Sequence, residues 1–176
     1  MSIHIIIDGY NLIRSSPAFS RAEQQSLQDG REALIAELAA YKKIKAHSIT
    51  VVFDGTGAPV HYPQRDLYRG IDVRFSGPGQ TADSVICKMA SKEREKALVV
   101  SSDRAIMRFA QSVGAAVIDS LEFEERMAMA MMEDAAGSQD APETESSPWN
   151  GTTRKKGPSK RLPKKKRKSR TRTRKL

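Results

Sequence analysis

Aspartates follow three short apolar, largely β-branched runs of this chain, and a fourth aspartate lies at the start of a helical segment. Asp8 occurs in IIIDGYNL, Asp54 in VVFDG, Asp103 in VVSSDR and Asp83 in QTADSVI. Short apolar runs that alternate with helical patterns predict a mainly parallel sheet covered by helices on both faces. Because the carboxyl ends of parallel strands open onto one edge, we expect the four carboxylates to gather there.

The rest of the pattern predicts a three-layer, mainly parallel α/β fold. The segment 10–21 contains Ser-Ser-Pro and is predicted to be a loop. Thr81 is the expected N-cap of one helix, Ser102 caps the next, and Gly114 fits the position just after that second helix. The expected strands are 3–7, 48–53, 71–75, 97–100 and 116–118, and the expected helices are 27–45, 81–95, 103–113 and 121–132.

Charge divides the chain into an acidic domain and a basic tail. Fourteen of the 30 Lys and Arg residues follow residue 153, whereas all 21 acidic residues precede Ser146, so residues 1–153 carry a net charge of −5. We predict a folded domain over 1–134, an acidic Ser/Pro linker over 135–150 and a disordered Lys/Arg-rich tail over 151–176. We expect a soluble cytoplasmic protein, since the sequence shows neither a secretory signal nor a membrane-spanning run.

Four carboxylates on one edge repel each other unless a cation lies between them. Oxygen donors suit hard ions, so Asp8, Asp83, Asp103 and Asp54 are predicted ligands of Mg²⁺ or Mn²⁺ at a phosphoryl-transfer site. Each aspartate alone could equally be a turn or N-cap residue, and this applies most to Asp54. Polar neighbours complete the predicted site: Asn11 as a catalytic residue, and Thr81, Ser101, Ser102 and Arg104 as substrate contacts. The single cysteine rules out an intramolecular disulfide or a Cys-rich zinc site.

The same motifs, in this order and spacing, resemble the NYN domain of the PIN-like nuclease superfamily, and in particular its YacP-like subgroup. The resemblance covers about residues 2–132. It implies a PIN-like, Rossmann-like sheet and a metal-dependent endoribonuclease, with Asp8, Asp83 and Asp103 as metal carboxylates and Asn11 and Asp54 in support. One position departs from the subgroup: Cys87 stands where an acidic residue often follows the TAD aspartate by one helical turn. A small core residue is the commoner role for such a cysteine, and a thiol is a poor ligand for Mg²⁺.

We therefore predict a Mg²⁺- or Mn²⁺-dependent endoribonuclease. Two alternatives stay open: a catalytically weak RNA- or ribosome-binding module, which Cys87 favours, and a DNA nuclease. The tail contains KKKRK between residues 162 and 172 and carries no aromatic residue. It can anchor RNA, or a ribosome, by charge without reading sequence.

Overall fold

Six strands form one sheet in the computed structural model, which describes residues 3–55 and 64–137. The strands are β1 (His4–Asp8), β2 (Ser48–Phe53), β3 (Arg65–Tyr68), β4 (Ile71–Phe75), β5 (Ala97–Val100) and β6 (Ala116–Ile118). Their order across the sheet is β3-β4-β2-β1-β5-β6, and only the edge strand β3 runs antiparallel to its neighbour. The expected three-layer, mainly parallel α/β fold is confirmed.

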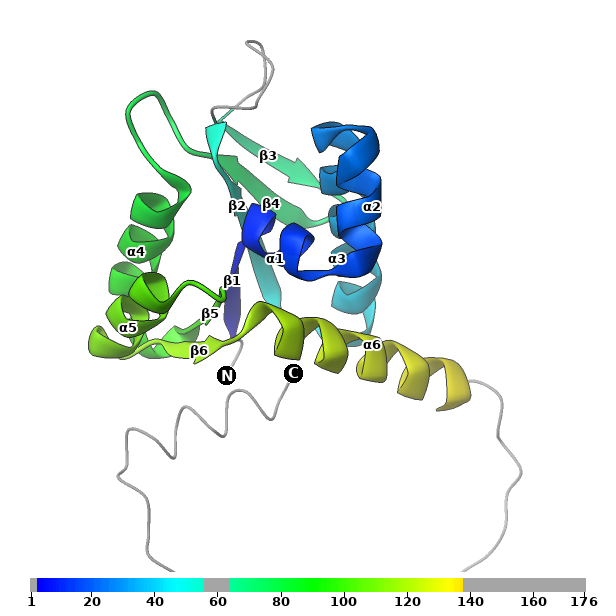
Figure 1. Cartoon of the computed structure of the whole chain (residues 1–176). Coiled ribbons are helices and arrows are strands. Elements are labelled where there is room, and N and C mark those ends of the chain that lie inside the picture. Colours follow the sequence, from blue (N-terminus) through cyan, green and yellow to red (C-terminus); the bar gives the residue numbers. More distant parts are fainter. Residues whose placement is uncertain (1–2, 56–63, 138–176) are drawn as a thin grey trace, which may run out of the picture.

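Helices cover both faces of this sheet (Figure 1). They are α1 (Gly9–Ser15), α2 (Pro17–Gln25), α3 (Leu27–Ile44), α4 (Ala82–Glu93), α5 (Arg104–Ser112) and α6 (Ser120–Gly137), with a short 3-10 helix at Arg94–Lys96. Alternate residues of β1 point into different cores. Ile5 and Ile7 pack in the core beneath α1, α2, α3 and α6, whereas Ile6 packs beneath α4 and α5. Strands buried on both faces explain the continuous apolar runs of the sequence.

The predicted loop at 10–21 is wrong, because this segment forms α1 and most of α2. Ser16 ends the first helix, and its Oγ accepts a hydrogen bond from the Phe19 N–H at 3.4 Å, so the same residue also caps the second helix. Pro17 occupies the first turn of α2, where its missing N–H costs nothing. Ser-Ser-Pro thus marks a junction between two helices, each too short for a clear apolar period.

The other differences lie at the margins of the fold. Strand β3 was not predicted, because its four residues are all exposed and show no apolar run. Helix α6 begins at Ser120 and runs through Gly137, past the boundary predicted at residue 134; the remainder of the linker and the basic tail lie outside the described residues. No helix within the described ranges is long and apolar enough to cross a membrane.

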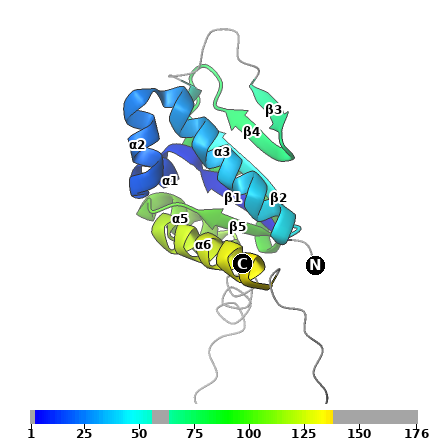
Figure 2. The same ribbon diagram turned by 90° about the vertical axis from the view of Figure 1, so that its right-hand side faces the viewer.

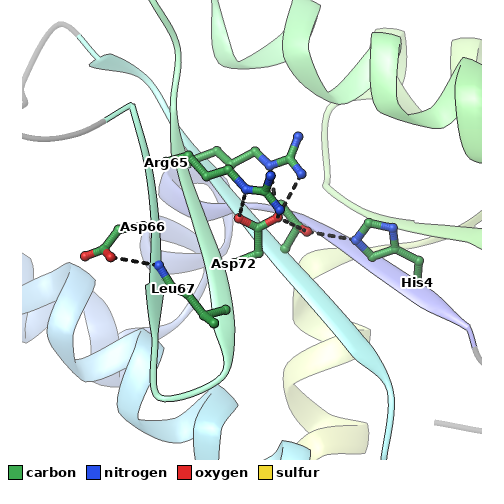
Figure 3. Close-up of polar contacts among 7 residues, drawn as sticks. His4, Arg65, Asp66, Leu67 and Asp72 are labelled. Atoms are coloured by element: carbon green, nitrogen blue, oxygen red, sulfur yellow. Dashed lines mark hydrogen bonds and ion pairs between the residues drawn. The ribbon is translucent and has the colours of Figure 1, made fainter.

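Strand β3 is held to the sheet by a polar cluster that spans several strands (Figure 3). Arg65 donates from Nε to Asp72 Oδ1 at 2.9 Å and from a terminal nitrogen to Oδ2 at 3.1 Å. Thr50 Oγ1 lies 3.4 Å from Asp72 Oδ2 and 2.8 Å from His4 Nε2. A two-point arginine–carboxylate contact fixes orientation better than a single bond does, so the β3–β4 hairpin has a defined geometry.

Candidate active site

Asp8 is the centre of the polar cluster at the carboxyl edge of the sheet. It ends β1 and caps α1, and its side chain is only 9% exposed. Its Oδ1 accepts a hydrogen bond from the Asn11 N–H at 3.4 Å, and its Oδ2 accepts one from Ser101 Oγ at 3.2 Å. The next residue is glycine because the start of α1 packs against the ring of Phe53. A Cβ atom added at Gly9 would lie 2.3 Å from that ring.

The chain topology brings the second segment of the site beside Asp8. From β1 the sheet grows through β2 and β4 on one side and through β5 and β6 on the other. The point where this direction reverses lies between β1 and β5, which is where open α/β sheets bind ligands. Ser101, at the end of β5, donates to Asp8 and accepts the Asp103 N–H at 3.1 Å. Ser101 is fully buried, so its position favours holding these aspartates over the substrate contact predicted for it.

Asp103 lies exposed at the beginning of α5. Its Oδ1 accepts the N–H groups of Ala105 at 2.6 Å and Ile106 at 3.2 Å, so Asp103 is the N-cap of this helix. The prediction that Ser102 caps the helix is wrong by one residue, because the side chain of Asp103 accepts the first-turn N–H groups; the Ser102 N–H is bound by a side chain from α1. Arg104 begins the helix and is exposed at the same rim.

Asn11 ties three segments of the chain together. Its side-chain oxygen accepts the Ser102 N–H at 2.9 Å and the hydroxyl of Ser120 at 2.7 Å. Ser120 is fully buried at the start of α6 and was not predicted from the sequence. The only signal for it was a serine shortly after an apolar strand, a pattern that also fits an ordinary turn. Through this oxygen, α1 fixes both the segment that carries Asp103 and the start of the last helix.

The third carboxylate comes from α4. Thr81 is the N-cap of this helix, as predicted, and accepts the Ser84 N–H at 3.2 Å, while Asp83 lies exposed in the first turn. The pKa of Asp8 is raised to about 6, first by burial and further by the charges of Asp83 and Asp103; its bonds from Asn11 and Ser101 oppose the rise. The structure thus brings Asp8, Asp83 and Asp103 into one electrostatic cluster.

The remaining predicted ligand, Asp54, directly follows β2 at the same edge. It is partly buried, and the next residue, Gly55, donates its N–H to Ser76 Oγ at 2.9 Å. Gly55 also approaches the Ser76 carbonyl so closely that an added Cβ would lie 2.1 Å from that oxygen. The backbone that carries Asp54 therefore has a fixed position, because the next residue packs closely against Ser76 at the end of β4.

Cys87 lies one turn after Asp83 on α4 and is partly exposed. The expectation of a core position is not met, since the buried residues of this helix are Ala82, Ile86, Met89 and Ala90. Burial raises the pKa of the thiol, and the charges of Asp83 and Asp103 raise it further, so the thiol lies within the electrostatic influence of both carboxylates. The thiol of Cys87, which stays protonated at neutral pH, thus lies at the rim of the acidic cluster.

The donor atoms of this cluster suit a hard cation that keeps part of its hydration shell. Within residues 3–55 and 64–137, no three Asp, Glu, His or Cys side chains lie close enough together to enclose an ion. Mg²⁺ is usually bound by one or two carboxylates, with water and substrate oxygens in its other positions. The carboxylates of Asp8, Asp83 and Asp103 fit that type of binding, and a buried carboxylate with a raised pKa is stabilised by a nearby positive charge.

Three kinds of comparison with known proteins give consistent matches. The model of the YacP-like NYN domain matches residues 5–175. The protein YacP of Bacillus subtilis (strain 168) is 29% identical over 86 residues, which make up 49% of this chain and 50% of YacP, so the match spans half of that relative. The crystal structure of Rae1 (YacP) from Bacillus subtilis aligns with a TM-score of 0.64 and 25% identity, covering 79% of this chain and 80% of that one. A point mutant of Rae1 aligns with a TM-score of 0.63 at 23% identity, covering 79% and 86%.

Proposed function

Because this chain belongs to the YacP-like NYN domain family, a nuclease-like family, we propose that it is an endoribonuclease that depends on Mg²⁺ or Mn²⁺. The observation that carries this proposal is the clustering of Asp8, Asp83 and Asp103 at the switch point of the sheet, where burial raises the pKa of Asp8 and the charges of Asp83 and Asp103 raise it further. Three carboxylates held together against repulsion suit a site that is completed by a cation. RNA is the proposed substrate, and the cytoplasm is the proposed place of action.

In this proposal, the three aspartates hold the metal directly or through water, and Asp54 is a further ligand from β2. When bound, such an ion lowers the pKa of a water molecule and neutralises charge on the phosphate under attack. Asp8 is ionised at neutral pH, because its raised pKa of about 6 still lies below 7. Its two oxygens are oriented by the Asn11 N–H and the Ser101 hydroxyl, which limits its rotation.

The other predicted site residues divide into two groups in this proposal. Ser101 and Asn11 position the carboxylates, because their oxygens are bound to neighbouring segments of the site. Thr81, Ser102 and Arg104 lie at the rim and contact the RNA backbone there, where Arg104 supplies a positive charge near the attacked phosphate.

Replacing one carboxylate tests the proposal. Asp8→Asn and Asp83→Asn remove a ligand charge at constant volume, so each should abolish cleavage of labelled RNA in Mn²⁺, as EDTA should for the unmodified chain. Asp29→Asn, an exposed change in the first turn of α3, is the matched control and should cleave normally. Cleavage by Asp8→Asn at the unmodified rate would contradict the proposal. Labelled DNA in the same assay separates an RNA enzyme from a DNA nuclease.

Cys87 favours one alternative, an RNA- or ribosome-binding module in which cleavage is weak. The charges of Asp83 and Asp103 help to raise the pKa of its thiol, which adds no negative charge to the cluster at neutral pH. A melting temperature that stays constant from zero to millimolar Mg²⁺ and Mn²⁺ would support this alternative. A bound ion stabilises the folded state instead, by about 2.7 kcal/mol at one hundred times its Kd.

The basic tail over 151–176 is proposed as an anchor for RNA or for the ribosome. It holds 14 positive charges and no candidate catalytic group. Such a segment adds affinity through phosphate contacts and leaves the chemical step unchanged.

A further inference from the structure

Two arginines lie on the same row of the sheet as Asp8. Asp8 of β1 is in register with Val52 of β2. Val52 is in register with Arg74 of β4, which in turn lies opposite Arg65 of β3. Neighbouring strands are about 4.8 Å apart, so the backbone of Arg74 lies about 10 Å from that of Asp8. A single strand of RNA that reaches one of these residues can therefore reach the other.

The side chains of Asp8 and Arg74 also point to the same face of the sheet. Val73 and Phe75, on either side of Arg74, pack in the core beneath α3, the helix that lies in front of the sheet in Figure 2. Since alternate residues of a strand point to opposite faces, Arg74 points to the other face, where α4 lies. Ile6 packs beneath α4, and Asp8, two residues later, belongs to the same face. The carboxylate and the arginine thus share one surface.

One carboxylate holds both arginines (Figure 3). Besides its two bonds from Arg65, Asp72 accepts bonds from Arg74, with Nε at 3.1 Å and a terminal nitrogen at 2.8 Å from Oδ2. Each guanidinium thus uses two of its five N–H groups. In the part of the chain that the structure describes, the other three have no protein acceptor. The side chain of Arg65 is 70% exposed and that of Arg74 29%, so both can take a further ligand.

The pair of arginines carries more charge than Asp72 neutralises. Arg65 and Arg74 occupy directly opposite positions on two antiparallel strands, where like charges repel each other. Asp72 supplies one negative charge against two positive ones, which leaves the cluster with an excess of positive charge. An anion on the outer edges of the two guanidiniums would offset this excess. The planar fork of arginine matches the oxygens of a phosphate, so a phosphate is the anion that suits it.

We propose that Arg65 and Arg74 bind a phosphate of the RNA strand close to the one that is cut. The strand crosses β2 from the acidic cluster, where the attacked phosphate lies near Asp8, to the two arginines, which hold a phosphate a nucleotide or two away. Asp72 positions both guanidiniums for this contact. The proposal rests on the proposed function for its substrate and adds the path of the strand across the sheet. Because every nucleotide carries the same phosphate, the contact places the RNA without selecting a sequence.

Binding without cleavage tests this site separately from the nuclease activity. The full chain in EDTA is titrated into a labelled oligouridylate at several salt concentrations. Arg74→Gln should weaken binding about tenfold, the effect of losing charged hydrogen bonds. It should also reduce the log–log salt slope by about 0.7, the effect of one phosphate contact. Arg65→Gln should act in the same direction, in a variant whose exposed position leaves folding intact.

The matched control is Arg69→Gln. It removes the same charge from the same hairpin, but Arg69 lies in the turn between β3 and β4. Because β4 begins just after this turn and runs parallel to β2, the turn is at the opposite edge of the sheet from the acidic cluster. This variant should bind the oligouridylate as the unmodified chain does, with the same salt slope.

Asp72→Asn separates phosphate binding from a purely structural role of the cluster. The change removes the ion pairs that hold β3 but keeps both arginines, so the oligouridylate should bind at least as tightly as it does to the unmodified chain. If the cluster only stabilised the hairpin, Asp72→Asn would act like Arg74→Gln. Equal losses of affinity in these two variants would therefore overturn the proposal.

The remaining outcomes distinguish this site from the nuclease activity. If Arg65→Gln and Arg74→Gln both bound like Arg69→Gln, the phosphate site would be wrong, and cleavage of the oligouridylate by the unmodified chain in Mn²⁺ would leave the nuclease proposal intact. The expected losses of affinity and of salt slope, in a chain that never cleaves RNA, would support the phosphate site and refute the nuclease.

Discussion

Replacing Asp8 with asparagine should stabilise the metal-free protein at neutral pH and leave it almost unchanged in acid. Folding moves this carboxyl from its ordinary pKa of 3.8 to about 6, first through burial and then through the charges of Asp83 and Asp103. A carboxyl with a raised pKa prefers to be protonated in the folded state. Its contribution to the free energy of unfolding is therefore fully present below pH 4 and is lost as the pH rises through 6.

The size of the effect follows from the pKa shift. A change of about two units corresponds to roughly 3 kcal/mol between acid and neutral pH. Asparagine resembles the protonated carboxyl, and the shift to about 6 already includes the opposing hydrogen bonds from Asn11 and Ser101. The gain in the free energy of unfolding should therefore be about 3 kcal/mol at pH 7.

Urea unfolding followed by circular dichroism in EDTA, at several pH values between 4 and 7.5, measures this difference. The free energies of unfolding of the unmodified chain and of Asp8→Asn should nearly coincide at about pH 4, diverge as the pH rises to about 6, and differ by a nearly constant amount above it. Asp29→Asn, at an exposed position, should follow the unmodified chain throughout. A variant that keeps the pH dependence of the unmodified chain, or that is less stable at pH 7, would show that folding does not raise the pKa of the Asp8 carboxyl.

Three further changes test other parts of the structure. Gly9→Ala should lower the free energy of unfolding by about 1–3 kcal/mol, because the new methyl group would overlap the ring of Phe53; urea unfolding measures it. Cys87→Glu should fold normally, since this position is partly exposed, and should shift the Mg²⁺ and Mn²⁺ dependence of cleavage. Deleting residues 151–176 should reduce the log–log salt slope of RNA binding by about 4, if about six of its 14 charges contact phosphates at ~0.7 each.

Each of these three expectations has a clear contrary result. A Gly9→Ala variant as stable as the unmodified chain would mean that the ring of Phe53 moves aside freely. A Cys87→Glu variant with unchanged metal dependence would place this side chain outside the reach of the cation. Equal salt slopes for the full and the shortened chain would show that the tail is not the RNA anchor.

The central strands and their aspartates could be predicted because burial on both faces leaves a direct mark on the sequence. The centre of β1, residues 5–7, is apolar because it is buried on both faces, so the residue at which this run stops, Asp8, identifies the edge of the sheet. Helix α5 was also found, together with Gly114, whose φ of +96° confirms the turn expected after that helix. These features depend on local pattern alone.

The features that were missed depend on contacts between distant segments. Whether Ser102 or Asp103 caps α5 depends on which side-chain oxygen reaches the N–H groups of the first turn. The backbone there is positioned by Asn11, 91 positions earlier, which binds the Ser102 N–H. The role of Ser120 could not be predicted from local pattern either, because its partner Asn11 lies 109 positions away in α1. The exposed strand β3 carries no apolar pattern and is defined by its pairing with β4 and by the ion pair of Arg65 with Asp72.

The order in which the site residues occur along the chain has a consequence for how the protein is made. Asp8 is synthesised first, but its partner Ser101 and the Ser120 that anchors Asn11 come from the last third of the folded domain. A growing chain on the ribosome therefore has its first carboxylate long before it has a site. Under the proposed function, a partly synthesised chain cannot damage the messenger that encodes it, and cutting begins only once β5 and β6 have closed the sheet beside β1.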